Sequence, residues 1–215
     1  MPVEVKFCGL TRAEDARVAA ELGARYVGVI FAGGPRNLDP DSAGKVLDGA
    51  GAHVDRVGVF GKDDPAAISA IVEEVKLDIV QLHADPTAAG VRALAEATGA
   101  RIWAVVRVDG PLDVDALQEL WDASDALVLD SKVKGSLGGS GTSFDWGAAK
   151  GMARGRVSPL VLAGGLTALN VEEAIETLSP DIVDVSSGVE SSPGTKDHAR
   201  MAEFMDSVRR AGVLR

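Results

Sequence analysis

Short runs rich in valine, isoleucine and leucine alternate along the chain with longer stretches whose apolar residues recur at helical spacing. Side chains alternate between the two faces of a strand and repeat every three to four residues on a helix, so the short runs predict strands and the longer ones helices. A strand followed by a helix recurs about every 26 residues, which suits a parallel strand with its crossover helix. The predicted strands are Val3–Phe7, Tyr26–Phe31, Val54–Phe60, Ile79–His83, Ile102–Arg107, Ala126–Asp130, Leu160–Ala163 and Ile182–Ser186.

Start and stop signals mark the predicted helices. Gly23 is suited to end the first helix, and Pro65 falls in a first turn, where its missing N–H costs nothing. Asp113 and Thr167 are predicted as N-cap residues. The predicted helices are Arg12–Leu22, Pro40–Leu47, Asp64–Val75, Pro86–Thr98, Asp113–Trp121, Thr167–Glu176 and Thr195–Arg210.

Eight strand–helix units follow one another without a linker or a break in composition. This order predicts an α/β protein, a single-domain (β/α)8 barrel of parallel strands over residues 1–215. An open doubly wound sheet would show the same alternation. We favour the barrel because an open sheet of eight strands is unusual at this length. The glycine-rich stretch 134–143 lies between the sixth strand and its helix, and we interpret it as a mobile lid.

The charge balance narrows the choice of partner. Lysine and arginine total 22 against 32 aspartate and glutamate residues, a formal net charge of −10. Nucleic acids and anionic membranes require clustered lysine and arginine, so we expect neither as a partner. A few placed cations and backbone N–H groups can still hold an anionic small ligand.

No apolar run approaches the ~18 residues of a membrane helix. The first residues also lack the order of a signal peptide, so we expect a soluble cytoplasmic protein.

Cysteine and histidine usage argues against a metal centre. Cys8 is the only cysteine, which excludes an internal disulfide and a multi-cysteine zinc site. The sequence holds no HExxH, CxxC or acidic calcium loop, and its three histidines are scattered. The glycines at 135–141 match neither GxxxxGK[ST] nor GxGxxG, so we expect no nucleotide loop. We therefore expect chemistry without a metal.

Ionisable side chains gather at one mouth of the predicted barrel. Alternate residues of a barrel strand point inward, and the C-terminal ends of the strands surround the active site. By this alternation Lys6 and Gln81 point inward, each two residues before the residue expected at the mouth, Cys8 or His83. The group expected at the mouth is Cys8, His83, Arg107, Asp130 and Asp184. Five such groups at one rim favour an active site.

Each of these residues also has a structural interpretation. A lone cysteine is often a small buried hydrophobe, and His83 and Asp130 could hydrogen-bond a loop. Cys8, however, shares a face with Lys6, whose ammonium group would lower the pKa of the thiol and favour a thiolate.

Glycine turns supply a second signal. Gly164-Gly165 follows the seventh strand and Ser187-Gly188 follows the eighth. Backbone N–H groups at these two positions form a phosphate cradle in many barrels. Gly-Gly alone is common in tight turns, but two such turns after strands seven and eight favour a bound phosphate.

The chain opens with the segment KFCGLT at 6–11, and further motif segments follow in order over nearly its whole length. These segments resemble those of the phosphoribosylanthranilate isomerase family, whose opening motif is KxCGLT. Gly34 stands where a serine often precedes the family's Pro-Arg, and Ala84 where a glycine usually follows QLH. The further matching segments are 27–32, 35–36, 57–60, 80–83, 129–131, 139–146, 162–166, 185–190 and 193–198.

The resemblance implies a (β/α)8 barrel that carries out an Amadori rearrangement of N-(5-phosphoribosyl)anthranilate without a cofactor, in tryptophan biosynthesis. Cys8 matches the family's general base and Asp130 its general acid. Arg36 matches the position associated with the anthranilate end of the substrate, and Asp184 an inward carboxylate near the substrate. The other residues expected to bind the phosphorylated substrate are His83, Gly164, Gly165, Ser187 and Gly188. We expect a monomer, with a homodimer as the alternative.

The sequence also allows other functions, each with a feature that would distinguish it. The analogous sugar isomerase of histidine biosynthesis shares the fold and the reaction, but places an aspartate where this chain has Cys8. A phosphosugar epimerase would need metal-binding histidines at another spacing. A non-catalytic barrel that binds phosphorylated ligands would lack an acid–base pair. A redox-active thiol protein would need a resolving cysteine.

Overall fold

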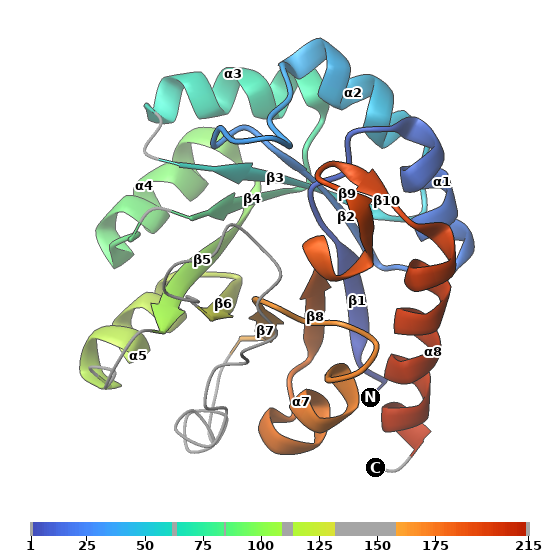
Figure 1. Cartoon of the computed structure of the whole chain (residues 1–215). Helices are drawn as coiled ribbons and strands as arrows, with labels where there is room; N and C mark the ends of the chain where they lie inside the picture. Colours follow the sequence, from blue (N-terminus) through green and yellow to red (C-terminus); the bar gives the residue numbers. More distant parts are fainter. Residues whose placement is uncertain (1, 62–63, 84, 109–113, 132–157, 214–215) are drawn as a thin grey trace.

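The computed structural model describes residues 2–61, 64–83, 85–108, 114–131 and 158–213. Eight parallel strands form a closed barrel in chain order, with β8 beside β1 (Figure 1). This closure confirms the predicted barrel and excludes the open sheet, which would leave two edges unpaired. The strands are β1 (Glu4–Phe7), β2 (Tyr26–Ile30), β3 (Asp55–Phe60), β4 (Ile79–Leu82), β5 (Arg101–Val108), β6 (Ala126–Ser131), β7 (Leu160–Ala163) and β8 (Ile182–Val185).

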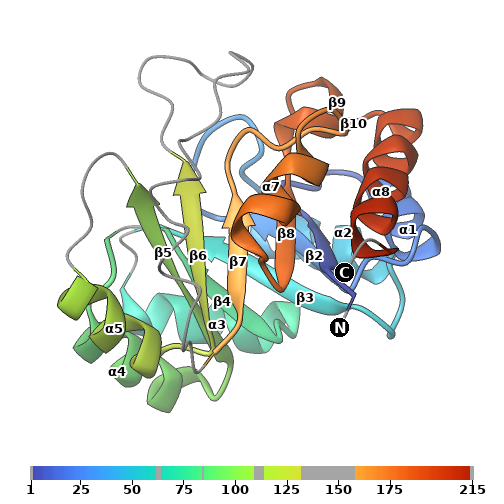
Figure 2. The ribbon, with the colours of Figure 1, turned by 90° about the horizontal axis from the view of Figure 1, so that it is seen from below.

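The helices lie around the outside of the strands, and α8 runs alongside α1 near the N-terminus (Figures 1 and 2). A short 3-10 turn, η1 (Ser187–Val189), and a two-stranded hairpin, β9 (Glu190–Ser192) and β10 (Thr195–Lys196), separate β8 from α8. The helices are α1 (Ala13–Glu21), α2 (Pro40–Asp48), α3 (Pro65–Val75), α4 (Ala88–Thr98), α5 (Val114–Ala123), α7 (Val171–Leu178) and α8 (His198–Val213).

Two of the predicted helix signals act as expected. Gly23 has a φ of 92° just after α1, and its N–H donates to the carbonyl of Ala20. The next N–H, that of Ala24, donates to Ala19, which completes the bonding pattern of a glycine-terminated helix. Pro65 occupies the first turn of α3. The predicted cap Asp113 lies outside the described residues.

Two predicted helix starts are wrong. The helix expected from Thr167 begins at Val171, because the Asn170 side chain accepts a hydrogen bond from the Thr167 N–H (2.8 Å) and holds the intervening residues in a turn. Thr195 and Lys196 belong to the hairpin, and α8 begins at His198. The Lys196 N–H donates to the side chain of Asp15 on α1 (3.2 Å), a partner that helical periodicity cannot reveal.

The alternation of side chains divides the apolar residues into two cores. Inside the barrel, Tyr26 and Trp103 pack edge to face at 5.0 Å between ring centroids, together with Val57, Val128 and Ile182 among others. The larger core lies between the strands and the helices. This division confirms the predicted alternation of inward and outward side chains along the strands, and it leaves the interior of the barrel apolar beneath its C-terminal mouth.

None of the helices in the described ranges is long and apolar enough to cross a membrane.

The contact between Phe7 of β1 and Phe204 of α8 should contribute strongly to stability. Both side chains are fully buried, with ring centroids 6.2 Å apart. Phe204→Ala should lower the free energy of unfolding by about 3–5 kcal/mol, because it removes apolar contact and leaves a cavity. Leu169→Ala is the control, since Leu169 is 97% exposed and its truncation should change little. Urea unfolding of both variants measures the difference, and equal effects would contradict the expectation.

Candidate active site

A cavity of about 280 Å³ opens at the C-terminal ends of the barrel strands. Its wall contains every residue expected from the sequence to act on or bind the substrate. These are Cys8, Arg36, His83, Asp130, Gly164, Gly165, Asp184, Ser187 and Gly188. Residues from both ends of the chain thus meet at one site, as the strand alternation predicts.

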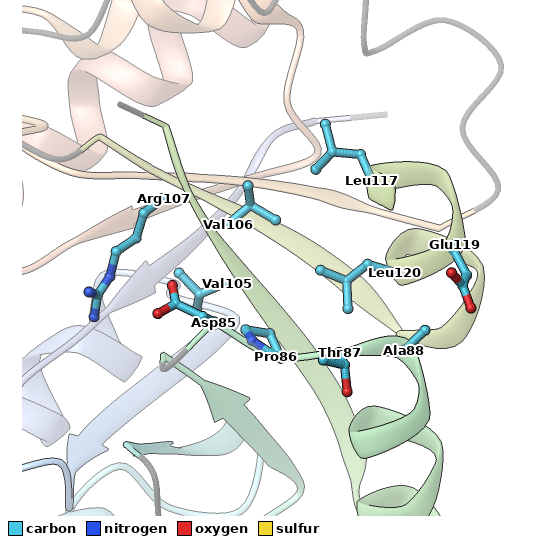
Figure 3. Close-up of a pocket in the computed structure, with 10 residues that line it drawn as sticks. All are labelled: Asp85, Pro86, Thr87, Ala88, Val105, Val106, Arg107, Leu117, Glu119 and Leu120. Atoms are coloured by element: carbon cyan, nitrogen blue, oxygen red, sulfur yellow. The ribbon is translucent and has the colours of Figure 1, made fainter. Parts of the chain in front are cut away.

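Arg107 is the exception among the five groups expected at the mouth. Its Nη2 donates to the backbone carbonyl of His83 (2.8 Å), and the residue lines a neighbouring cavity and not this one. This second, larger cavity has a volume of about 430 Å³ and lies between the start of α4, β5 and α5. Figure 3 shows Arg107 across β5 from the apolar residues Leu117 and Leu120. That cavity contains none of the proposed reactive groups, so the smaller cavity is the candidate site.

A buried network of three polar side chains lies at the base of the cavity, where Gln81 and Asp184 form part of the wall. The Lys6 ammonium group is fully buried and donates to Asp184 Oδ2 (2.7 Å) and Gln81 Oε1 (2.8 Å). Burial lowers the pKa of Lys6, but the Asp184 carboxylate and Cys8 outweigh this and leave it raised. Asp184 Oδ1 has no hydrogen-bond partner among the described residues. Because Asp184 lines the cavity, this oxygen is suited to accept a hydrogen bond from a ligand.

Cys8 follows β1, and its N–H donates to the carbonyl of Val185 on β8 (2.9 Å). Gly28 makes room for the thiol, because a Cβ atom at this position would lie 3.2 Å from Cys8 Sγ and 3.0 Å from Lys6 Cε. The thiol and the lysine stem therefore lie against the same backbone.

The expected lowering of the thiol pKa is wrong. Burial raises the pKa of Cys8 and the Asp184 carboxylate adds to this, whereas Lys6 and Lys196 act against it without cancelling it. Lys6 does lower the pKa of the thiol as expected, but the loss of hydration on burial is the larger effect.

Asp130 lies opposite His83, with 3.4 Å between Oδ2 and Nε2. Burial raises the pKa of Asp130, and Asp184 contributes in the same direction against the opposing effect of His83, Arg107 and Lys6. Burial likewise lowers the pKa of His83. Both shifts favour the uncharged forms, so the carboxyl group holds its proton more readily than a carboxyl group in water.

The two glycine turns lie against each other on one side of the cavity. Gly164 and Gly165 have φ values of 92° and 66°, which side chains rarely permit. A Cβ atom at Gly188 would lie only 1.9 Å from the carbonyl oxygen of Leu166, so the turn after β8 can approach the turn after β7 only with glycine. The backbone is thereby exposed to a ligand on this side of the cavity.

Arg36 extends over the start of the chain from the loop after β2. A Cβ atom at Gly9 would lie 2.5 Å from Arg36 Cδ, so glycine beside Cys8 leaves the space that the arginine occupies. The guanidinium group donates through Nε and Nη2 to Glu190, and Lys196 donates to the same carboxylate. Sequence reasoning assigned no role to Glu190 or Lys196, because their contact with Arg36 exists only in the folded chain.

The glycine-rich stretch 134–143 and the matching segment 139–146 lie outside the described residues. Within the ranges that are described, no group of three or more histidine, cysteine, aspartate or glutamate side chains could hold a metal ion.

Comparison with known proteins places this chain in a family. The family model for N-(5'-phosphoribosyl)anthranilate isomerase matches residues 5–207. The N-(5'-phosphoribosyl)anthranilate isomerase of Paramagnetospirillum magneticum is 40% identical over 213 residues, which cover 97% of this chain and 98% of the relative.

Two solved structures have the same fold. The phosphoribosyl anthranilate isomerase of Thermotoga maritima has a TM-score of 0.88 and 36% identity, covering 97% of this chain and 99% of its own. A second isomerase structure, in complex with reduced 1-(o-carboxyphenylamino)-1-deoxyribulose 5-phosphate, has a TM-score of 0.85 and 33% identity with the same coverage. The family match over most of the sequence, together with these similarities, shows that this chain belongs to the N-(5'-phosphoribosyl)anthranilate isomerase family.

Proposed function

We propose that this chain converts N-(5-phosphoribosyl)anthranilate into 1-(2-carboxyphenylamino)-1-deoxyribulose 5-phosphate, a step of tryptophan biosynthesis, with Cys8 as general base and Asp130 as general acid. The observation that carries the assignment of roles is the shared cavity. A thiol from β1 and a carboxyl group from β6 line it together with the glycine turns after β7 and β8. Such a set of groups suits an Amadori rearrangement of a phosphorylated sugar.

The reaction needs two proton transfers at different atoms. Asp130 gives a proton to the furanose ring oxygen, the bond between that oxygen and C1 breaks, and the nitrogen lone pair forms a protonated Schiff base. The Schiff base acidifies the C2–H bond, and the Cys8 thiolate removes that proton. The electrons of the bond form an enol amine, which becomes the ketone product. Each positioned proton transfer contributes about 10²–10⁴-fold in rate.

The pKa shifts act differently on the two groups. Burial raises the pKa of Asp130, which helps this carboxyl group to keep the proton that it donates. Burial also raises the pKa of Cys8, so the thiolate forms less readily than at a cysteine in water, but it is a strong base once formed because its surroundings do not stabilise it. The reactive form of the pair carries a single proton, on the carboxyl group, with a thiolate at Cys8.

The remaining residues of the wall bind the substrate. The turns at Gly164-Gly165 and Ser187-Gly188 hold the phosphate with backbone N–H groups, as glycine turns do at this position in many barrels. Arg36 pairs with the anthranilate carboxylate. The free oxygen of Asp184 accepts a hydrogen bond from a sugar hydroxyl.

A fluorescence assay with freshly made phosphoribosylanthranilate tests the function directly, because turnover abolishes the fluorescence of its anthranilate group. A catalytic decrease in signal supports the assignment. A rate equal to the uncatalysed reaction would contradict it.

Cys8→Ser should fold normally and lose at least ~10²-fold in kcat/KM, because a serine hydroxyl is a far weaker base than a thiolate. Cys8→Asp should retain more activity than Cys8→Ala, since a carboxylate can still accept the proton. Near-parental activity of Cys8→Ser would remove the thiol from the mechanism.

Asp130→Asn should lose at least ~10²-fold in kcat/KM and change the shape of the pH profile. The parent should give a bell, because the reactive form holds one proton on the pair and is lost at both lower and higher pH. The variant has no acid to lose, so its residual activity should rise with pH through the pKa of Cys8 and then level off.

Thermal unfolding separates this effect from misfolding. The raised pKa of Asp130 means that the folded state disfavours its ionised form, so removing the charge should not lower stability at neutral pH. Asp206→Asn on the exposed face of α8 is the control for the charge change. A bell-shaped profile in Asp130→Asn would contradict the assignment.

Lys196→Met should raise the pKa of the Cys8 thiol further, because the positive charge of Lys196 lowers it in the parent. Cys8 is the only cysteine, so thiolate absorbance near 240 nm followed over pH reports this group, with the tyrosine contribution subtracted from a Cys8→Ser titration. Lys45→Met, at an exposed lysine of α2, should leave the titration unchanged. An unchanged or lower thiol pKa in Lys196→Met would contradict this effect.

A further inference from the structure

Glu190 is a buried carboxylate that the proposed proton transfers do not use. It is 7% exposed and does not line the cavity. Burial alone would raise its pKa, but the hydrogen bonds from Arg36 and Lys196 hold the pKa of Glu190 below its usual value. Glu190 is therefore ionised at neutral pH, and such a group is retained in a protein interior only where its partners compensate for the lost hydration.

Three donors meet at the Glu190 carboxylate. Arg36 Nε lies 2.8 Å from Oε1 and Arg36 Nη2 lies 2.6 Å from Oε2, a two-point contact that fixes the plane of the guanidinium group. Lys196 Nζ lies 2.9 Å from Oε1 and also donates to the carbonyl of Ser186 (3.0 Å).

The hairpin holds Glu190 in place. Glu190 and Lys196 are paired residues of β9 and β10. The start of α1 fastens β10, because Asp15 accepts from the Lys196 N–H and Arg12 donates to the Lys196 carbonyl (3.1 Å). Asp15 is itself fully buried and bound by Arg12 through two further hydrogen bonds. The carboxylate is thus set on a rigid support.

The contact divides the donors of Arg36 between two sides. Nε and one N–H of Nη2 face Glu190, which leaves the Nη1 group and the second N–H of Nη2 on another edge. The Arg36 side chain lines the cavity and is 21% exposed, whereas that of Glu190 is 5% exposed. Glu190 carries one negative charge between the two cations Arg36 and Lys196, so a positive charge remains for an anionic ligand.

We propose that Glu190 is a positioning residue that orients Arg36, so that the guanidinium group presents its free edge to the carboxylate at the aromatic end of the substrate. This inference rests on the proposed function, in which Arg36 binds that carboxylate. Without Glu190, Arg36 would have to be ordered on binding and would face Lys196 without the intervening negative charge.

A double-mutant cycle between Arg36 and Glu190 tests the inference. The variants are Arg36→Ala, Glu190→Gln and the two combined, each assayed for KM and kcat. Affinity is measured for reduced 1-(o-carboxyphenylamino)-1-deoxyribulose 5-phosphate, and for ribulose 5-phosphate, which lacks the aromatic carboxylate. Glu172→Gln is the matched control, because Glu172 accepts from Arg210 through the same two nitrogens but on the exposed surface of α7 and α8.

Glu190→Gln should raise KM and weaken binding of the reduced product analogue by ~10-fold or more, with a smaller change in kcat. Affinity for ribulose 5-phosphate should stay within about twofold of the parent. In the Arg36→Ala background, Glu190→Gln should add less than about twofold, because the group that it orients is gone. Glu172→Gln should match the parent in every measurement.

Three different results would overturn the inference. If Arg36→Ala weakens binding of the analogue and Glu190→Gln does not, or weakens it equally in both backgrounds, the positioning role is wrong while the proposed function stands. If Arg36→Ala leaves analogue affinity unchanged, the assigned role of Arg36 fails and the inference fails with it, although turnover in the fluorescence assay would still establish the activity.

Glu190→Asp keeps the inference testable if circular dichroism shows that Glu190→Gln is unfolded. This variant keeps the charge but shortens the reach of the carboxylate. It should raise KM in the parent background and have no effect on KM in the Arg36→Ala background. Parental KM in Glu190→Asp would overturn the proposal.

Discussion

The ion pair between Lys6 and Asp184 is the constraint on which the arrangement of the site depends. A fully buried ammonium group is tolerated only with a well-placed counter-charge, and here the counter-charge comes from the other end of the chain. The register of β1 on β8 puts the two residues side by side, and Gln81 reaches the same nitrogen from β4. The polar layer therefore forms only when the barrel is closed, and it separates the apolar floor from the reactive mouth.

Burial has opposite consequences for binding and for proton transfer. It strengthens each charge-assisted contact in the cavity, but it also raises the pKa of both Cys8 and Asp130. A raised pKa helps the acid to keep its proton and hinders the base from losing its own. In the proposed chemistry the raised pKa of Cys8 has a compensating effect, because a thiolate that forms less often is a stronger base. Lys6 and Lys196 limit the cost by placing positive charge near the sulfur.

Residues inside regular strands were predictable from the sequence because the alternation of a strand leaves no freedom of direction. Lys6 and Gln81 are turned inward in this way, and their hydrogen bond across the barrel shows it. Arg107 also follows the alternation, but a long side chain at a strand end can turn away from the cavity, and its contact with His83 decides its direction. The direction of the Cys8 pKa shift could not be predicted from the sequence, because it depends mainly on how completely the folded chain buries the thiol.

The hairpin after β8 could not be predicted from the sequence, for a different reason. Its two strands are short, and its side chains bind residues far away in the sequence, such as Asp15 on α1 and Arg36 after β2. The pattern of neighbouring residues in the sequence does not indicate which distant residues these side chains will contact. Closure of the barrel brings these segments together, since it places the loop after β8 next to the loops after β1 and β2. Cys8 and the support for Arg36 therefore depend on the same seam between β8 and β1, so the proposed base and the proposed carboxylate-binding group are both in place only when these two strands pair.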